Sequence, residues 1–180
     1  MQLLTALARR INTLNHKIGL VAAWVVLPMV LLQVVIVLMR YVFGIGSVML
    51  QESIVYMHAF LFMVMAGYTL LHDSHVRIDV FYREASPKTK ALVNLIGSVA
   101  FLIPVCVLII WVSWTYVSIS WSVLEGSKET SGIPGVFLLK SLIIVFAALI
   151  GIQGVSLAVR SLCVLRGFPW PDSKEEVKQP

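Results

Sequence analysis

The chain has 180 residues, of which 59% are hydrophobic and 13% are charged. A typical soluble domain has about 45–50% apolar and about 25% charged residues, so this composition excludes an ordinary soluble protein and indicates a membrane protein. The formal net charge of +5 does not indicate a nucleic-acid partner, because the basic residues lie between apolar runs and not in one patch. Cys106 and Cys163 lie in or beside different apolar runs, without the spacing of a disulfide framework or a redox motif.

Residues 1–17 are basic and amphipathic. Leu3, Leu4, Leu7, Ile11 and Leu14 recur at helical spacing, with polar and basic residues between them. This pattern is typical of a helix that lies in the membrane interface, and a frayed basic tail is the alternative. A secretory signal peptide is not expected, because the apolar run that follows is too long and lacks a small-residue cleavage site.

Runs without Asp, Glu, Lys or Arg cover residues 18–39, 53–72, 91–124 and 141–159. Each is long enough to cross about 30 Å of hydrocarbon as a helix, and only helices or closed barrels satisfy their backbone hydrogen bonds in lipid. The last helix is expected to begin earlier, because Ser131, Gly132 and Pro134 resemble a helix start, which puts Lys140 more than one turn inside it. The sequence thus predicts an all-α integral membrane protein with four transmembrane helices, over about 18–39, 53–72, 91–124 and 134–159. These helices form a membrane domain of residues 18–160, and residues 161–180 form a tail.

The third run of 34 residues would rise about 51 Å as a helix, more than a simple span requires. It is expected to tilt, bend or protrude, with Pro104 as the favoured bend because proline removes a backbone donor.

Lysine and arginine are divided unequally between the two faces of this topology. Eleven lie in the N-terminal segment, the second loop and the C-terminal tail, against three on the other face, which are Arg40, Lys128 and Lys140. Because basic residues accumulate on the cytoplasmic side, both termini are predicted to be cytoplasmic. The basic excess is therefore interpreted as a topology and anionic-lipid signal.

The spans hold few groups that could support chemistry. His58 is the only histidine within a span, so haem ligation between facing helices is not expected, and the chain has no zinc spacing, Ser/His/Asp set or phosphate loop. We therefore predict no enzyme activity, no catalytic residue, no cofactor and no metal. The deep polar residues are Gln33, His58, Asn94 and Gln153, none of which is an obvious carboxylate proton relay. A stand-alone small four-helix transporter and a membrane anchor of a redox complex remain the alternatives to an interaction subunit.

Small residues in the last helix indicate close helix packing. Ala147 and Gly151, and then Gly154 and Ala158, are four residues apart and would let another helix approach. The approaching helix could belong to this chain's own bundle or to a partner.

Four segments in order carry a family resemblance: residues 40–43 (RYVF), Gln51 with Glu52, residues 75–79 (HVRID) and residues 125–134 (EGSKETSGIP). Together they resemble the small membrane subunit of tripartite ATP-independent periplasmic (TRAP) transporters, over about residues 20–160. The family often has a tryptophan just before the glutamate, where this chain has Leu50. The resemblance implies a bacterial inner-membrane scaffold whose partners are a large membrane subunit, a periplasmic binding protein and membrane lipids. It also implies sodium-driven import of a small organic acid or related solute, with the substrate contacts in the other two proteins.

The matched segments supply candidate structural or subunit-interface residues. Glu52 could pair with Arg40 or with Lys140, since a charge partly shielded from water needs a partner, or these side chains could reach the interface separately. His75, Arg77 and Asp79 could lock a loop against the large subunit or merely cap a helix. Glu125 and Glu129 could contact the binding protein or lie in a solvated loop.

Overall fold

The structure is a computed structural model that describes residues 2–75, 82 and 84–168. Its described part is helical, with four helical rods long and apolar enough to cross a membrane, which confirms the predicted fold class. The elements are α1 (Gln2–Ala23), α2 (Val26–Tyr41), α3 (Val48–Val64), α4 (Ala66–Leu71), α5 (Pro87–Ile96), the π-helical segment η1 (Gly97–Leu102), α6 (Ile103–Ser122) and α7 (Val136–Leu165). The rods are α1–α2, α3–α4, α5–η1–α6 and α7.

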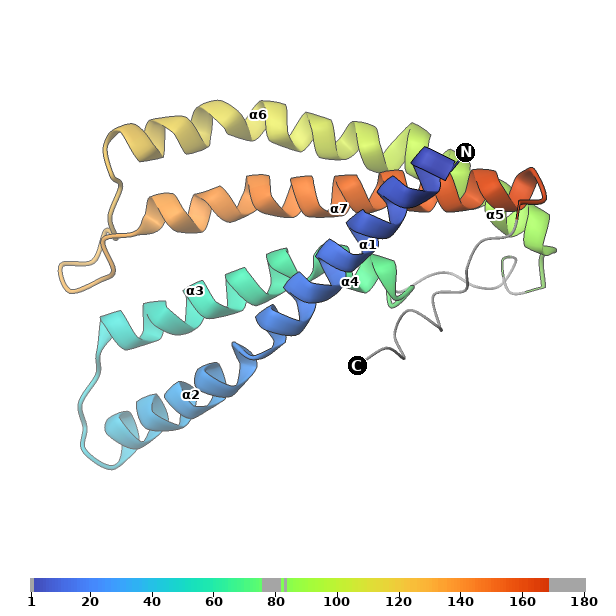
Figure 1. Ribbon diagram of the computed structural model, residues 1–180. Coiled ribbons are helices and arrows are strands. Elements are labelled where there is room, and N and C mark those ends of the chain that lie inside the picture. Colours follow the sequence, from blue (N-terminus) through green and yellow to red (C-terminus); the bar gives the residue numbers. More distant parts are fainter. Residues whose placement is uncertain (1, 76–81, 83, 169–180) are drawn as a thin grey trace.

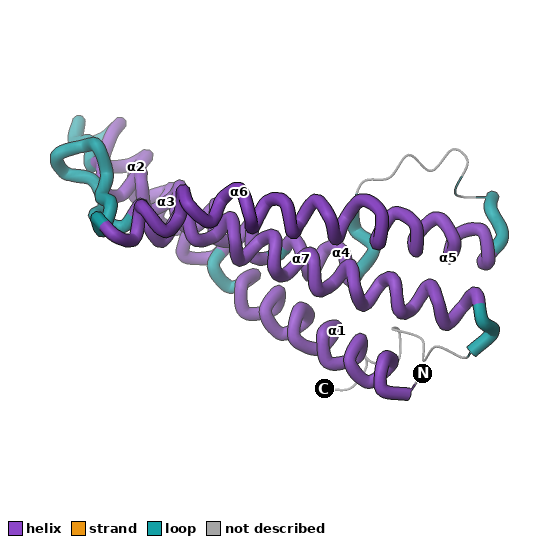
Figure 2. Tube along the Cα trace, turned by 90° about the horizontal axis from the view of Figure 1, so that it is seen from above, coloured by secondary structure: helices purple, strands orange, loops and turns teal. Residues whose placement is uncertain are grey.

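The rods define two ends of the bundle (Figures 1 and 2). One end holds the α2–α3 loop (residues 42–47) and the α6–α7 loop (residues 123–135). The other end holds the start of α1, the start of α5 and the end of α7. The charge distribution of the sequence makes the first of these the predicted outer end and the second the predicted inner end.

The α7 helix is the centre of the bundle. It packs against α1, α3, α4, α5, η1 and α6, and Figure 1 shows α1 crossing it obliquely. Its small residues admit these neighbours, because a Cβ atom on Gly154 would lie 2.8 Å from Leu102 and one on Gly151 would lie 3.2 Å from Cys106. Both contacts lie within the chain's own bundle, as does the fully buried Ala147. Close approach at small residues thus holds α7 in place among its own neighbours.

A break separates α1 from α2 at Trp24 and Val25, inside the first predicted span. The Trp24 and Val25 amides donate to the carbonyls of Val21 and Ala22, three residues back, at 3.2 and 3.0 Å. Pro28 explains the break, because it has no N–H for the Trp24 carbonyl and its ring would crowd that oxygen. Past the break, α2 packs against α3 and has no buried residue.

The α1 helix faces the bundle with small and amide residues, which are Ala8, Asn12, Asn15, Gly19 and Ala22. Asn12 and Asn15 are buried against α7, whereas the leucines of the predicted stripe are turned outward, with Leu3 87% exposed. An apolar face turned away from the protein is the orientation that a lipid environment favours.

The third rod accommodates its proline through η1. The amide of Ile103 donates to the carbonyl of Ser98, five residues back, directly before Pro104. The wider turn of a π-helix moves the preceding carbonyls away from the proline ring, so the rod continues to Ser122 without a break.

Candidate functional site

Glu52 anchors the α6–α7 loop at the predicted outer end. It lies in the first turns of α3. Ser47 caps the start of this helix, because its hydroxyl accepts a hydrogen bond from the amide of Leu50. The Glu52 carboxylate accepts one hydrogen bond from the Ser127 hydroxyl and another, at 2.6 Å, from the amide of Ile133. We call these three residues the Glu52 anchor.

Glycine is required beside the Glu52 anchor. A Cβ atom on Gly132 would collide with the Ser127 side chain and lie 2.8 Å from Glu52 Oε1. The loop can therefore close over the carboxylate only because position 132 has no side chain.

A second carboxylate holds the same loop from its α6 side. Glu125 accepts hydrogen bonds from Lys140 Nζ at 2.5 Å and from the Ser120 hydroxyl at 2.7 Å. Lys140 also lies 4.0 Å above the centre of the Tyr116 ring, in a cation–π contact. The hydrogen bond from Lys140, followed by that from Ser120, lowers the pKa of Glu125 below its ordinary value.

These contacts correct the predicted pairing of Glu52. Lys140 pairs with Glu125, while Glu52 bonds to the loop. Arg40 lies exposed at the end of α2, and Glu129 lies exposed in the α6–α7 loop. The structure therefore brings Glu52, Glu125 and Lys140 to one loop but does not bring Arg40 to Glu52.

The predicted inner segment of the family resemblance, residues 75–79, is only partly described. His75 is exposed shortly after α4, and Arg77 and Asp79 lie outside the described residues. The proposed lock against a large subunit therefore stays a prediction. In the part of the chain that the structure describes, no group of three or more His, Cys, Asp or Glu side chains is arranged to hold a metal ion.

A buried polar cluster joins α1 to α7 nearer the predicted inner end. Asn15 Nδ2 donates to Gln153 Oε1 at 2.8 Å, and Gln153 Nε2 donates to Asn12 Oδ1 at 3.1 Å. The Ser156 hydroxyl donates to the same Asn12 oxygen at 2.6 Å. We call these four residues the α1–α7 polar cluster. Sequence reasoning identified Gln153 as a deep polar residue but missed its partners, although the three-residue spacing of Asn12 and Asn15 matches that of Gln153 and Ser156.

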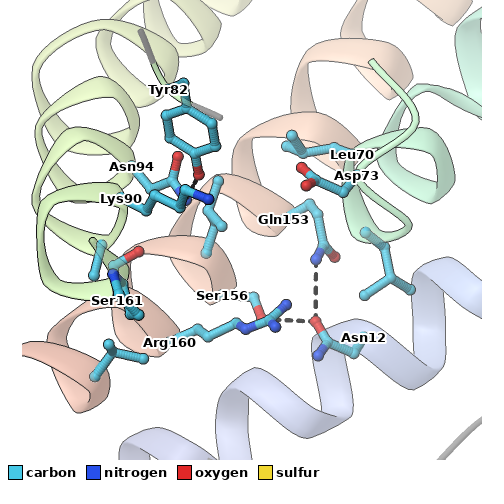
Figure 3. A pocket seen from close by; sticks show the side chains of 15 residues that line it. Asn12, Leu70, Asp73, Tyr82, Lys90, Asn94, Gln153, Ser156, Arg160 and Ser161 are labelled. Carbon is cyan, nitrogen blue, oxygen red and sulfur yellow. Dashed lines mark hydrogen bonds between the residues drawn. The ribbon is translucent and has the colours of Figure 1, made fainter. Parts of the chain in front are cut away.

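A cavity of about 280 Å³ lies beside this cluster, between α1, α4, α5 and α7. Figure 3 shows Arg160 extending across it toward Asn12, with Tyr82, Lys90 and Asn94 on the opposite wall. On that wall, Asn94 Nδ2 donates to the Tyr82 hydroxyl at 2.9 Å, and the Lys90 ammonium lies 5.4 Å from the Tyr82 ring centre. Such a site can bind a polar group, whereas the Glu52 anchor and the Glu125–Lys140 pair use their charges to hold a loop.

Comparison with known proteins identifies the family. The family model described as tripartite ATP-independent periplasmic transporters, DctQ component, matches residues 29–164, about three quarters of the chain. Curated proteins and solved structures give no significant match. The family match confirms the resemblance found in the four sequence segments. The chain therefore belongs to the DctQ component family, the small membrane subunits of TRAP transporters.

Proposed function

We propose that this chain is the scaffold of a sodium-driven TRAP transporter in a bacterial inner membrane. Membership of the family indicates partnership with a large membrane subunit and a binding protein. In the proposed complex those two proteins capture and move a small organic acid or related solute, and this chain holds the fixed part of the large subunit in the bilayer.

The observation that carries this proposal is that polar groups buried in the bundle form hydrogen bonds with one another. Asn12, Asn15, Gln153 and Ser156 bond to one another across α1 and α7. A transport pathway needs polar groups that exchange partners with a moving ion or substrate, whereas polar groups bonded to each other tie helices together. The loop carboxylates Glu52 and Glu125 are likewise bonded within the chain. This pattern favours a rigid support over a mobile carrier.

The peripheral helix α2 supports an interaction role. It is apolar, has no buried residue and leaves Leu31 59% and Val34 51% exposed. In a bilayer this surface is available to lipid tails and to the helices of another subunit.

Copurification tests the partnership. A tagged copy of this chain, expressed with its neighbouring transporter genes and extracted in mild detergent, should retain the large membrane subunit. A redox anchor would instead retain a cofactor-bearing partner, and a stand-alone transporter would retain neither. Recovery of a stable lone chain from cells that express both subunits would contradict the proposal.

Cytoplasmic termini are part of the same proposal, supported by the excess of eleven basic residues over three on the other face. A cysteine introduced at Ser173 should resist an impermeant thiol reagent in intact spheroplasts and react after lysis. Labelling before lysis would contradict this orientation.

A further inference from the structure

The cavity beside the α1–α7 polar cluster has no role in the proposed scaffold. Its volume of about 280 Å³ far exceeds the roughly 10–15 Å³ that a single water needs. We infer that it binds the phosphate group of an anionic phospholipid headgroup. The inference does not depend on the scaffold proposal, because it concerns only this chain and the bilayer around it.

The charges on the cavity wall favour an anion. Among the described residues that line it, Arg160 of α7 and Lys90 of α5 are basic and Asp73 is acidic, which gives these lining residues a net charge of +1. The guanidinium of arginine presents several donors in a planar fork that matches the oxygens of a phosphate. Figure 3 shows the Arg160 side chain extending across the view of the cavity in the direction of Asn12, and both residues line it.

The buried wall also presents donors. Asn12 is 9% exposed, and its side-chain oxygen already accepts from Gln153 and Ser156. The side chain of Asn12 can therefore offer only its N–H groups to a ligand. Ser161, 3% exposed, adds a hydroxyl to the lining of the same cavity. Oxygen atoms of a phosphate accept hydrogen bonds from both kinds of donor.

The depth of the site favours a lipid over free phosphate. The 30 residues of α7 rise about 45 Å, which matches the roughly 40–45 Å thickness of a bilayer with its headgroups. Arg160 lies five residues before the end of α7, or about 8 Å along its axis, at the boundary between headgroups and hydrocarbon. Basic pockets between membrane helices at this depth bind lipid headgroups.

Native mass spectrometry of the purified full chain tests the inference. The chain is titrated with phosphatidylglycerol, with phosphatidylcholine and with inorganic phosphate. We expect one tightly retained phosphatidylglycerol per chain, weaker retention of zwitterionic phosphatidylcholine, and only weak competition by phosphate. Phosphate that binds as tightly as phosphatidylglycerol would overturn the lipid assignment in favour of a free ion, and equal retention of both lipids would show that the site does not select an anion.

Matched variants connect binding to the cavity. Arg160→Gln should weaken phosphatidylglycerol binding about tenfold or more, because hydrogen bonds to a charged group are lost. Arg10→Gln removes the same charge from an exposed position on α1 and should leave binding within about twofold. Equal affinity in the wild type and Arg160→Gln, or an equal loss in both variants, would overturn the inference.

A second pair keeps the test valid if Arg160→Gln does not fold. Asn12→Asp keeps the oxygen that accepts from Gln153 and Ser156 but places a negative charge in the cavity, so lipid retention should fall. Gln2→Glu adds the same charge at an exposed position of α1 and should have little effect. A third outcome is possible in the complex with the large subunit. The lipid could be lost when the complex forms, and Arg160→Gln could weaken the complex. Both results together would show that an acidic side chain of the subunit occupies the cavity, and they would overturn the lipid inference.

Discussion

Glu52 on α3 and Glu125 within the α6–α7 loop both hold that loop in place, and their partners differ in charge. Glu125 contacts an ammonium group and a hydroxyl, whereas Glu52 contacts a hydroxyl and a backbone amide. Hydrogen bonds to an ionised carboxylate are stronger than those between neutral groups, so both contacts depend on the negative charge.

The contribution of this loop to stability should therefore fall in acid, because Glu125 loses its negative charge. Its pKa is lower in the folded chain than in the unfolded chain, because Lys140 and Ser120 donate to the ionised form. This contribution to stability is complete above the ordinary glutamate pKa of about 4.3 and is lost as the pH falls through the lowered folded-state value. The unfolding temperature of Glu125→Gln should lie below that of the wild type at pH 6, and the difference should shrink as the pH approaches about 3.

Glu129→Gln is the control for this pH series, because the Glu129 side chain is exposed in the same loop. Its unfolding temperature should follow that of the wild type throughout. A Glu125→Gln deficit that stays constant from pH 6 to about pH 3 would show that the charge of Glu125 does not hold the loop.

Gln153 is the residue of α7 that bonds to both asparagines of the α1–α7 polar cluster. It is 4% exposed and bonds to both Asn12 and Asn15. Gln153→Leu keeps a similar volume but leaves the Asn15 amide, 1% exposed, without its partner. We expect the free energy of unfolding to fall by about 1–2 kcal/mol. This value lies between the average contribution of a hydrogen bond in a membrane bundle and the cost of leaving a buried polar group unpaired in a water-soluble protein.

Reversible unfolding in mixed detergent micelles measures this loss. Gln33→Leu makes the same chemical change at an exposed position of α2 and should change the unfolding free energy by less than about 0.5 kcal/mol. Similar losses in the two variants would mean that the α1–α7 polar cluster does not stabilise the bundle.

The partners of these residues could not be predicted from the sequence. Ser127 lies 75 positions from Glu52, and Gln153 lies 138 from Asn15, so both contacts depend on which rods lie side by side. Arg40 and Lys140 were reasonable partners for Glu52 by charge. The loop instead supplies a hydroxyl and an amide, and Gly132 admits them.

At the scale of elements, the four spanning helices could be predicted from the sequence, because hydropathy and the length of the apolar runs determine them. The four apolar runs correspond to four rods, because the energetic cost of unpaired backbone groups in lipid leaves helices as the simplest structure. The break at Trp24 and Val25 was missed although Pro28 stands in the sequence, because proline in a membrane helix can also be absorbed without a break. The π-helical segment before Pro104 is an example of such absorption.

The packing of α1 on α4 depends on Gly19. A Cβ atom there would collide with the Tyr68 ring, which lies 4.1 Å from the His72 ring and 5.8 Å from the His16 ring, centre to centre. Gly19→Ala should therefore displace Tyr68 or α1 and cost about 1–3 kcal/mol of unfolding free energy, as overpacking typically does.

Gly97→Ala is the matched change at an open position, since a Cβ atom added at Gly97 would meet nothing within 4 Å. It should be neutral or stabilising by up to about 1 kcal/mol, because alanine favours helix over glycine. Unfolding in detergent distinguishes the two variants. A neutral Gly19→Ala would show that α1 and α4 do not approach as closely as described.

At the scale of the whole molecule, the bundle is built around α7 and leaves much of its apolar surface uncovered. Trp111 is 77% exposed and Phe62 70% exposed, so the molecule needs a hydrophobic environment of lipid or protein. Family membership indicates that part of this surface is covered by the other subunits of a transporter. The charged and polar groups that bond to one another within the chain are consistent with a support that does not itself carry substrate.

Sodium-dependent uptake into proteoliposomes tests the scaffold proposal most directly. The substrate is one that the binding protein of the same system is shown to bind, and vesicles contain this chain alone, the large subunit alone, or both, each with the binding protein added outside. We predict uptake only when both membrane subunits are present, with the lone chain indistinguishable from empty vesicles. Sodium-driven uptake by the lone chain, or full uptake by the large subunit without it, would contradict the proposal.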